Sequence, residues 1–315
     1  MTRPYPDAAD PAAANVSTAA AFSAADRAAQ LAGVRIDELA SMAELRLAHR
    51  LAAEIWGSAV DSPPITAELG RAIGHAGGYL SGAWQGDPAS TAPERLIGVC
   101  VGFLGRDRSL HSHLCGVDPA ARGHQVGYAL KLHQRAWALG AGLAEITWTF
   151  DPLVRRNAFI NLAKLGARAT QYLPDFYGVM ADQLNAGDEH SDRLLVRWPL
   201  VDPRVTRACA GAPVEVDLEA LRRGGASIAL AAGGDGRPHE PPQPPPSAPA
   251  GGSGQVRLVQ VPADIAAVRA ADPATGQAWR AASRRLLGEH LDGGGRIAGF
   301  HRDGWYVLDR EEAGT

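Results

Sequence analysis

The most informative part of this chain is the stretch LHSHLCGVDPAARGHQVGYAL, residues 110–130. Its first half alternates apolar and polar residues as a half-buried strand does, and its second half begins a helical pattern. Arg122, Gly123 and Gly127 lie where that helix starts. A helix N-terminus presents unpaired N–H groups and a partial positive charge, which suits a pyrophosphate. The bare pattern leaves an ordinary strand-to-helix turn as the alternative, and it is neither a Rossmann nor a Walker loop.

Strand and helix patterns alternate on both sides of this stretch. The predicted strands are residues 34–39, 79–84, 95–105, 109–117, 144–150, 168–173 and 192–200. The predicted helices are residues 41–57, 65–78, 125–142 and 157–167. A strand, a long helix and a further strand in this order make a right-handed crossover. The sequence therefore predicts a mixed α/β domain.

The two ends of the chain differ from its centre. Residues 1–32 are small and weakly apolar and are expected to form a disordered tail, and residues 33–222 hold the α/β domain. Residues 223–254 are rich in Pro and Gly, which predicts a flexible linker or a surface loop. Residues 255–315 read as a strand, a helix and a hairpin. About 60 residues is marginal for an independent fold, so we expect a small α+β extension docked on the core.

Composition and charge exclude several classes of protein. A net charge of -3 gives no broad positive field for nucleic acid or an anionic membrane. The longest apolar run, residues 96–105, is half the length of a membrane span, and no signal-peptide pattern opens the sequence. The 3 cysteines are odd in number and widely spaced, which argues against disulfides and a four-ligand zinc site. A cytoplasmic protein without a metal is expected.

Part of the opening stretch resembles the signature of the GNAT superfamily of acyl-CoA-dependent acyltransferases, Arg/Gln-x-x-Gly-x-Gly/Ala. The first and last positions of the signature match at Arg122 and Gly127, and Gln125 stands in place of the middle glycine. A glutamine backbone still donates an N–H, so the loop remains a candidate for the pyrophosphate. The preceding Val-Asp-Pro at residues 117–119 is typical of the end of the family's fourth strand.

A second family element supports the resemblance. NAFINLAKLGA at residues 157–167 is similar to the family's Asn-containing helix that ends in Lys-Leu-Gly, and order and spacing agree over residues 33–200. A bacterial subgroup of predicted GNAT acetyltransferases is similar over nearly the whole chain outside the tail and the Pro-rich stretch. The runs that carry this closer resemblance are residues 148–167, 172–178, 192–198, 261–280 and 306–310.

The resemblance implies a GNAT fold, a central mixed sheet in which the parallel fourth and fifth strands splay apart around acyl-CoA. These strands would be near residues 113–117 and 146–150. A backbone N–H of the fourth strand would hold the oxyanion during direct acyl transfer. The residues implied to bind the cofactor are Cys115, Val117, Arg122, Gly123, His124, Gln125, Val126, Gly127, Tyr128, Asn157 and Asn161.

His111 and His113 are the candidates for the general base. They share one face of the strand by period-two alternation, and an unperturbed imidazole titrates near neutrality. Position favours His113, and a structural role is the alternative for each. The tyrosine that many GNAT enzymes carry on the Asn helix is replaced by Leu162. Tyr177 is the substitute candidate for the acid, with Tyr172 behind it.

Four other polar or aromatic residues have both a functional and a structural interpretation. Asn157 and Asn161 share a helix face, suited to pantetheine amides or to a core hydrogen-bond pair. Asp151 either grips a cationic substrate or caps the following helix. Trp148 is either a substrate platform or a core residue.

Cysteine and arginine residues are weaker candidates for functional roles. Cys115 on the strand is discounted as an acyl carrier, because a strand cysteine without an activating partner is usually inert. Arg280 and Arg284 lie one helical turn apart and suit a carboxylate, but Lys131 and Lys164 are the only lysines among 31 Lys and Arg residues. Single arginines are therefore common here, and a solvated face is the simpler interpretation of the pair.

The leading hypothesis is an acyl-CoA-dependent N-acyltransferase acting on a small amine, with an amino acid as one option. Acetyl-CoA is the default donor and succinyl-CoA the alternative. A non-catalytic acyl-CoA sensor is the second class, because Gln125 and the absent helix tyrosine depart from the family pattern. No nucleic acid, membrane or metal is expected as a partner, and the protein is expected to be a monomer or homodimer.

Overall fold

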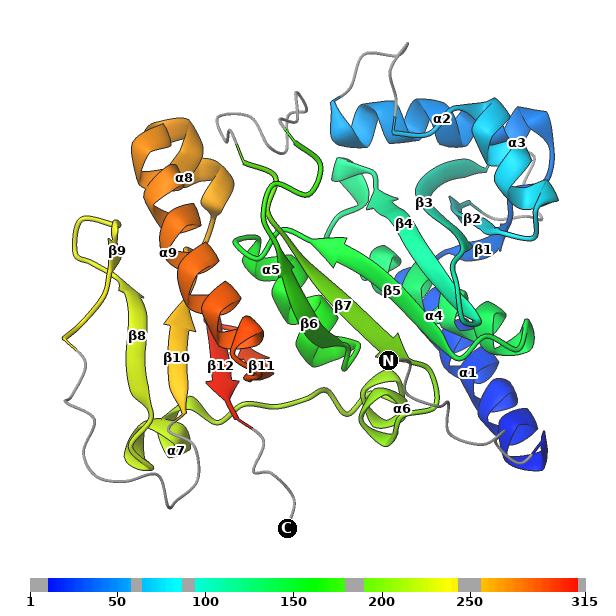
Figure 1. Cartoon of the computed structure of the whole chain (residues 1–315). Coiled ribbons are helices and arrows are strands. Elements are labelled where there is room, and N and C mark those ends of the chain that lie inside the picture. Colours follow the sequence, from blue (N-terminus) through cyan, green and yellow to red (C-terminus); the bar gives the residue numbers. More distant parts are fainter. Residues whose placement is uncertain (1–10, 58–63, 87–93, 179–189, 243–255, 311–315) are drawn as a thin grey trace. The chain divides into compact units, whose positions relative to one another are not determined.

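The computed structural model describes residues 11–57, 64–86, 94–178, 190–242 and 256–310 of the 315 (Figure 1). The chain divides into two compact units, residues 1–146 (unit 1) and residues 147–315 (unit 2). The division falls within strand β5 (Glu145–Phe150), not near residue 222 where the sequence places a boundary. Over the described ranges, no helix combines the length and apolar character that crossing a membrane requires.

Unit 1 is built on four strands that pair antiparallel in chain order. They are β1 (Arg35–Glu38), β2 (Tyr79–Gln85), β3 (Arg95–Leu104) and β4 (Ser109–Val117). Two helices, α2 (Met42–Trp56) and α3 (Ala67–His75), connect β1 to β2. A capping box starts α2, because Ser41 Oγ accepts the Glu44 N–H and Glu44 Oε2 accepts the Ser41 N–H at 2.8 Å. The apolar face of α2 then packs on β3 and β4.

Two further helices of unit 1 pack on each other. Turn η1 (Pro119–Ala121) leads into α4 (Val126–Gly140), and α1 (Pro11–Ala32) lies along α4 (Figure 1). Ala21 and Ala25 of α1 are each 2% exposed. The expectation of a disordered tail is thus wrong for residues 11–32, while residues 1–10 lie outside the described residues. Alanine gives little apolar pattern in a sequence, but it has the highest helix propensity and lets two helices approach closely.

The main sheet has seven strands in the hydrogen-bonded order β1-β2-β3-β4-β5-β7-β6. Strand β5 runs parallel to β4, and β6 (Arg168–Leu173) pairs antiparallel with β7 (Arg193–Pro199). The sheet is therefore mixed, which confirms the predicted fold class.

Unit 2 contains a second, five-stranded sheet in the order β11-β12-β10-β8-β9. Its strands are β8 (Ser227–Ala232), β9 (Pro238–His239), β10 (Arg257–Gln260), β11 (Arg296–His301) and β12 (Trp305–Asp309). The remaining elements of unit 2 are α5 (Arg155–Ala158), the π-helix η2 (Phe159–Lys164), α6 (Pro203–Cys209), α7 (Leu218–Arg223), α8 (Ile265–Ala271) and α9 (Pro273–Asp292).

The second sheet changes the predicted boundaries of the linker. Strand β8 pairs in parallel with β10, so residues 227–232 belong to the C-terminal sheet rather than to a linker beginning at residue 223. Residues 243–255 of the Pro-rich stretch lie outside the described residues. Within unit 2 the C-terminal segment packs on the preceding part, since α9 lies on β6 and Tyr306 donates a 2.8 Å hydrogen bond to the Pro152 carbonyl.

Candidate functional site

Strand β4 contains a β-bulge at His113. Val101 of β3 pairs with Leu114, but the next residue, Gly102, pairs with Ser112. His113 is therefore the extra residue, and an extra residue locally disrupts the hydrogen-bond ladder. Alternation alone does not reveal this bulge, which the sequence analysis missed.

The two candidate bases lie together beside an aromatic ring. The rings of His111 and His113 are centred 5.2 and 5.7 Å from that of Phe103. Burial lowers the pKa of His111 and of His113, and for His113 a hydrogen bond to the Pro64 carbonyl partly opposes this. Both imidazoles are consequently neutral at pH 7, the state in which a histidine accepts a proton.

Residues after the bulge contact helix α4. Cys115 Sγ lies 4.0 Å from the Gly127 carbonyl oxygen, and Val117 packs beside Gly127. Ser112, before the bulge, also contacts α4 through Lys131, although it lies three residues from Cys115. In a regular strand, residues three apart point to opposite faces of the sheet. Ser112 and Cys115 both face α4 because the bulge lies between them.

The loop before α4 has left-handed backbone at two positions. Gly123 has φ 94° and Gln125, the N-cap, has φ 62°. Position 125 thus has the conformation that glycine adopts at no steric cost. The Gln125 side chain makes no capping hydrogen bond to α4 in the described loop, so the first N–H groups of the helix are not capped by that residue.

Gly127 is not required by the packing of unit 1. A Cβ added there would meet only Val117 Cγ2, at 3.5 Å, which is an ordinary contact. Glycine in a helix costs about 1 kcal/mol relative to alanine. Packing therefore does not explain glycine here, and close approach of a ligand to the backbone is one established use of glycine.

The other residues of the loop before α4 differ in exposure. Arg122 and His124 are exposed, Val126 is buried, and Tyr128 is half-buried in the first turn of α4. Asp118 anchors the loop through its carboxylate, which accepts the Ala120 N–H at 2.8 Å.

In unit 2, Tyr177 is exposed and its hydroxyl lies beside β5. The hydroxyl oxygen is 3.3 Å from Thr149 Oγ1, and the Arg193 guanidinium lies over the ring at 5.2 Å. The Tyr177 N–H donates to Ser191 Oγ at 2.9 Å, which fixes the turn that carries it. Tyr172 is buried instead and donates to Asp192 at 2.7 Å, so it has a structural role.

Asn157 and Asn161 differ in burial. Asn157 is exposed, whereas Asn161 is 7% exposed. Asn157 belongs to the short helix α5 and Asn161 to the π-helix η2. Their expected roles, contacts to pantetheine amides or a core hydrogen-bond pair, stay predictions.

Asp151 and Trp148 are both buried in unit 2. Asp151 accepts two 2.8 Å hydrogen bonds from Arg280, one of 3.1 Å from Arg269 and one of 2.9 Å from the Leu153 N–H. Its oxygens are thus occupied by the protein, which corrects the predicted substrate contact. The capping alternative is also wrong, because Val154 is the N-cap of α5 and that helix has no side-chain cap. Trp148 packs edge-on against Trp198 with centroids 5.6 Å apart, which likewise places it in the core.

The expected solvated face of α9 is also corrected. Arg280 is 1% exposed, and Arg284 binds Asp192 and Asp175. Both arginines therefore clamp carboxylates of this chain. Each arginine's partner is more than 90 residues away in sequence, so no local pattern reveals it.

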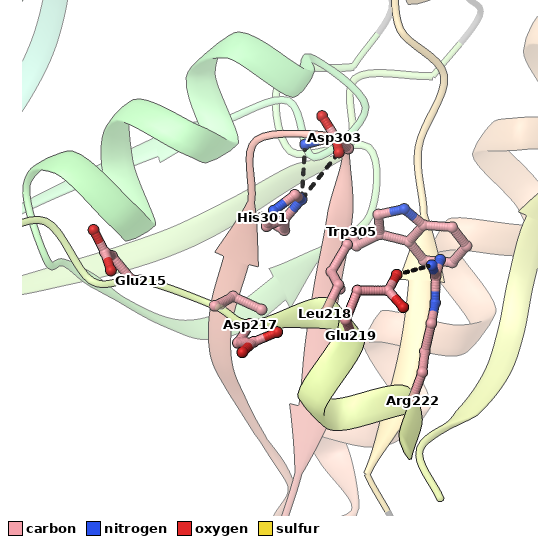
Figure 2. Close-up of a pocket in the computed structure, with 9 residues that line it drawn as sticks. Glu215, Asp217, Leu218, Glu219, Arg222, His301, Asp303 and Trp305 are labelled. Carbon is pink, nitrogen blue, oxygen red and sulfur yellow. Dashed lines mark hydrogen bonds and ion pairs between the residues drawn. The ribbon is translucent and has the colours of Figure 1, made fainter. Parts of the chain in front are cut away.

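A hollow of about 490 Å³ lies in unit 2 beside α7 and the β11–β12 hairpin (Figure 2). Its lining is Glu215, Val216, Asp217, Leu218, Glu219, Arg222, His301, Asp303 and Trp305. Arg222 bonds Glu219 at 3.0 Å and lies over the Trp305 ring. None of these lining residues is among the candidate site residues that the sequence singles out.

No family model and no curated protein matches this chain. Solved structures similar to it include the ribosomal-protein-S18-alanine N-acetyltransferase from Escherichia coli, at 12% identity and TM-score 0.41, over 53% of this chain and 94% of that one. A GNAT superfamily phosphinothricin acetyltransferase from Sinorhizobium meliloti in complex with AcCoA is similar at 16% identity and TM-score 0.42, over 59% of this chain and 96% of that one. An IAA acetyltransferase from Bacillus cereus is similar at 17% identity and TM-score 0.39, over 53% and 99%. Each of these matches covers only about half of this chain.

Proposed function

We propose that this protein is an acyl-CoA-dependent N-acyltransferase of the GNAT type. The observation that carries the proposal is the glycine at position 127, in the first turn of α4, where packing leaves room for a side chain. A ligand that approaches the helix N-terminus closely accounts for it, and the partial positive charge there suits the pyrophosphate of CoA. The signature match at Arg122 and Gly127 supports the same ligand.

His113 is the proposed general base. Its lowered pKa keeps the imidazole neutral at pH 7, so it can take the proton of an attacking amine directly or through one water. The amine nitrogen then bonds to the thioester carbonyl carbon, and the carbon–sulfur bond breaks. A backbone N–H released from the ladder by the bulge at His113 would donate to the oxyanion in between.

Tyr177 is the proposed acid that protonates the departing CoA thiolate. Its exposed side chain and its fixed turn support this role. The acceptor that we propose is a small amine, with an amino acid as one option, and the donor is acetyl-CoA, with succinyl-CoA as the alternative. The further expectations of a cytoplasmic location and of a monomer or homodimer are retained as proposals.

Two measurements on the full chain test the proposal. Calorimetric titration with CoA and acetyl-CoA measures binding, and a thiol-release assay with acetyl-CoA or succinyl-CoA against amino acids and polyamines measures transfer. Binding together with amine-dependent thiol release supports the transferase. Binding without release from any pair favours the acyl-CoA sensor, and no binding of any acyl-CoA overturns both.

A further inference from the structure

Cys100 on β3 and Cys115 on β4 face each other across the two strands. They are direct partners in the antiparallel register, and both are free thiols. Directly opposed residues of antiparallel strands have Cα atoms about 4.5–5.5 Å apart. A disulfide spans Cα separations of about 4.4–6.8 Å, so the strands need not move to bridge the two sulfurs.

The bulge creates this pairing. Gly102 pairs with Ser112, and unbroken pairing from there would place Leu114 opposite Cys100. The extra residue His113 moves Cys115 into that position instead.

A buried lysine lies beside the thiols. Lys131 of α4 is 6% exposed, with its Nζ 2.8 Å from Ser112 Oγ and 3.0 Å from Gln134 Oε1. A hydrogen bond from the Cys100 thiol, aided by the charge of Lys131, lowers the pKa of Cys115. Burial raises the pKa of Cys100. Cys115 is therefore the more readily deprotonated of the two thiols.

The two thiols also differ in access. Cys115 is partly exposed, whereas Cys100 is 0% exposed. A small oxidant reaches Cys115 first. A thiolate beside a positive charge, with a second thiol in contact, is the arrangement in which oxidation stops at a disulfide rather than at higher acids.

We infer that Cys115 and Cys100 form a peroxide-sensitive thiol pair, in which Cys115 is attacked first and Cys100 resolves the product. The Cys115 thiolate attacks hydrogen peroxide, a sulfur–oxygen bond forms, the oxygen–oxygen bond breaks, and the released hydroxide takes a proton to become water. The Cys100 sulfur then attacks the Cys115 sulfenic acid, a disulfide forms, and hydroxide leaves with the Cys100 proton as a second water. One peroxide is reduced for each two thiols oxidised, and no part of this step depends on the proposed transferase activity.

The test treats the reduced full chain with hydrogen peroxide, alkylates the remaining thiols and maps them by mass spectrometry. A Cys100–Cys115 disulfide with Cys209 still alkylated is the expected product. Cys209→Ser, which changes a buried cysteine of α6, is the matched control and should give the same disulfide at the same rate. Oxidation of Cys209 as fast as that of Cys115, or a disulfide between two chains, would overturn the inference.

Single variants assign the order of the two steps. Cys100→Ser should accumulate a sulfenic acid at Cys115 that dimedone traps, and Cys115→Ser should lose fast oxidation altogether. Lys131→Gln should slow the reaction of Cys115 about tenfold at pH 7, as a one-unit rise in the thiol pKa would. If that variant does not fold, the pH dependence of wild-type oxidation replaces it, and an inflection at or above the ordinary cysteine pKa counts against the inference. Trapping at Cys100 in the Cys115→Ser protein would reverse the proposed order.

Discussion

The guanidinium of Arg280 and the carboxylate of Asp151 form a two-point ion pair inside unit 2. Arg280 Nη1 lies 2.8 Å from Asp151 Oδ1, and Nη2 lies 2.8 Å from Oδ2. Arg269 adds a third hydrogen bond to the same carboxylate. Helices α8 and α9 of the C-terminal segment are thereby joined to the end of β5.

Removing Arg280 should strongly destabilise unit 2. In the Arg280→Met variant the Asp151 carboxylate stays buried but loses the two hydrogen bonds and the charge of Arg280. Breaking a buried ion pair costs about 3–5 kcal/mol. Urea unfolding followed by circular dichroism measures the loss. Arg168→Met, which removes an exposed ion pair with Asp202 at 3.0 Å, is the control and should cost about 1 kcal/mol or less. Equal losses in the two variants would refute the structural importance of the buried pair.

The same pair predicts a dependence of stability on acid pH. Burial raises the pKa of Asp151, but the charges and hydrogen bonds of Arg280 and Arg269 outweigh it and lower the pKa to about 2. An unfolded aspartate titrates at about 3.9. Because the unfolded chain binds the proton first, this stabilisation is complete above about pH 4 and is lost as the pH falls toward 2. The unfolding free energy of the wild type should fall as the pH is lowered from about 4 to 2, and that of Arg280→Met should fall less steeply.

Gly127 and Gly140 lie in the same helix and test the ligand contact separately from the fold. A Cβ at Gly140 would meet only the Phe22 ring, at 3.7 Å, so both Gly→Ala variants should keep or raise stability by up to about 1 kcal/mol. Calorimetry should show weaker CoA binding for Gly127→Ala and unchanged binding for Gly140→Ala. Unchanged CoA affinity in Gly127→Ala, and also in the bulkier Gly127→Leu, would remove the loop from the proposed site.

Gln125→Gly should stabilise the protein. The residue has φ 62°, and left-handed backbone costs a non-glycine residue about 1–2 kcal/mol, part of which the entropy of glycine offsets. We expect a gain of up to about 1 kcal/mol in thermal or urea unfolding, with CoA affinity kept or increased. A loss of stability would show that interactions of the glutamine side chain outweigh the backbone term.

His113→Ala should lower the transfer rate by about 10²-fold or more while CoA affinity stays within a few-fold. Burial lowers the pKa of His113, so the pH at which it loses its proton lies below the ordinary histidine pKa. The wild-type transfer rate should therefore rise with pH below that value and stay level at higher pH. That rise should vanish in His113→Ala and persist in His111→Ala. Equal rates with the same pH profile in wild type and His113→Ala would assign a structural role to His113.

Local sequence patterns predict most of the secondary structure. A continuous apolar run placed β3, alternation placed β4, and the N-cap Ser41 with Glu44 three residues later placed the start of α2. These signals are local, because the partners that satisfy each backbone group lie within a few residues. The helix at residues 11–32 was missed, since its buried alanines face α4, a contact that the sequence does not show.

Which side chains meet depends on contacts that form only in the folded chain. The bulge at His113 shifts the pairing of β3 and β4 by one residue from Val101 and Leu114 onward, and so sets Cys115 opposite Cys100. Likewise, Arg280 is buried because Asp151, 129 positions earlier, needs a charge partner in the core. Register and long-range charge pairing depend on contacts summed over the folded chain, so no short window of sequence contains them.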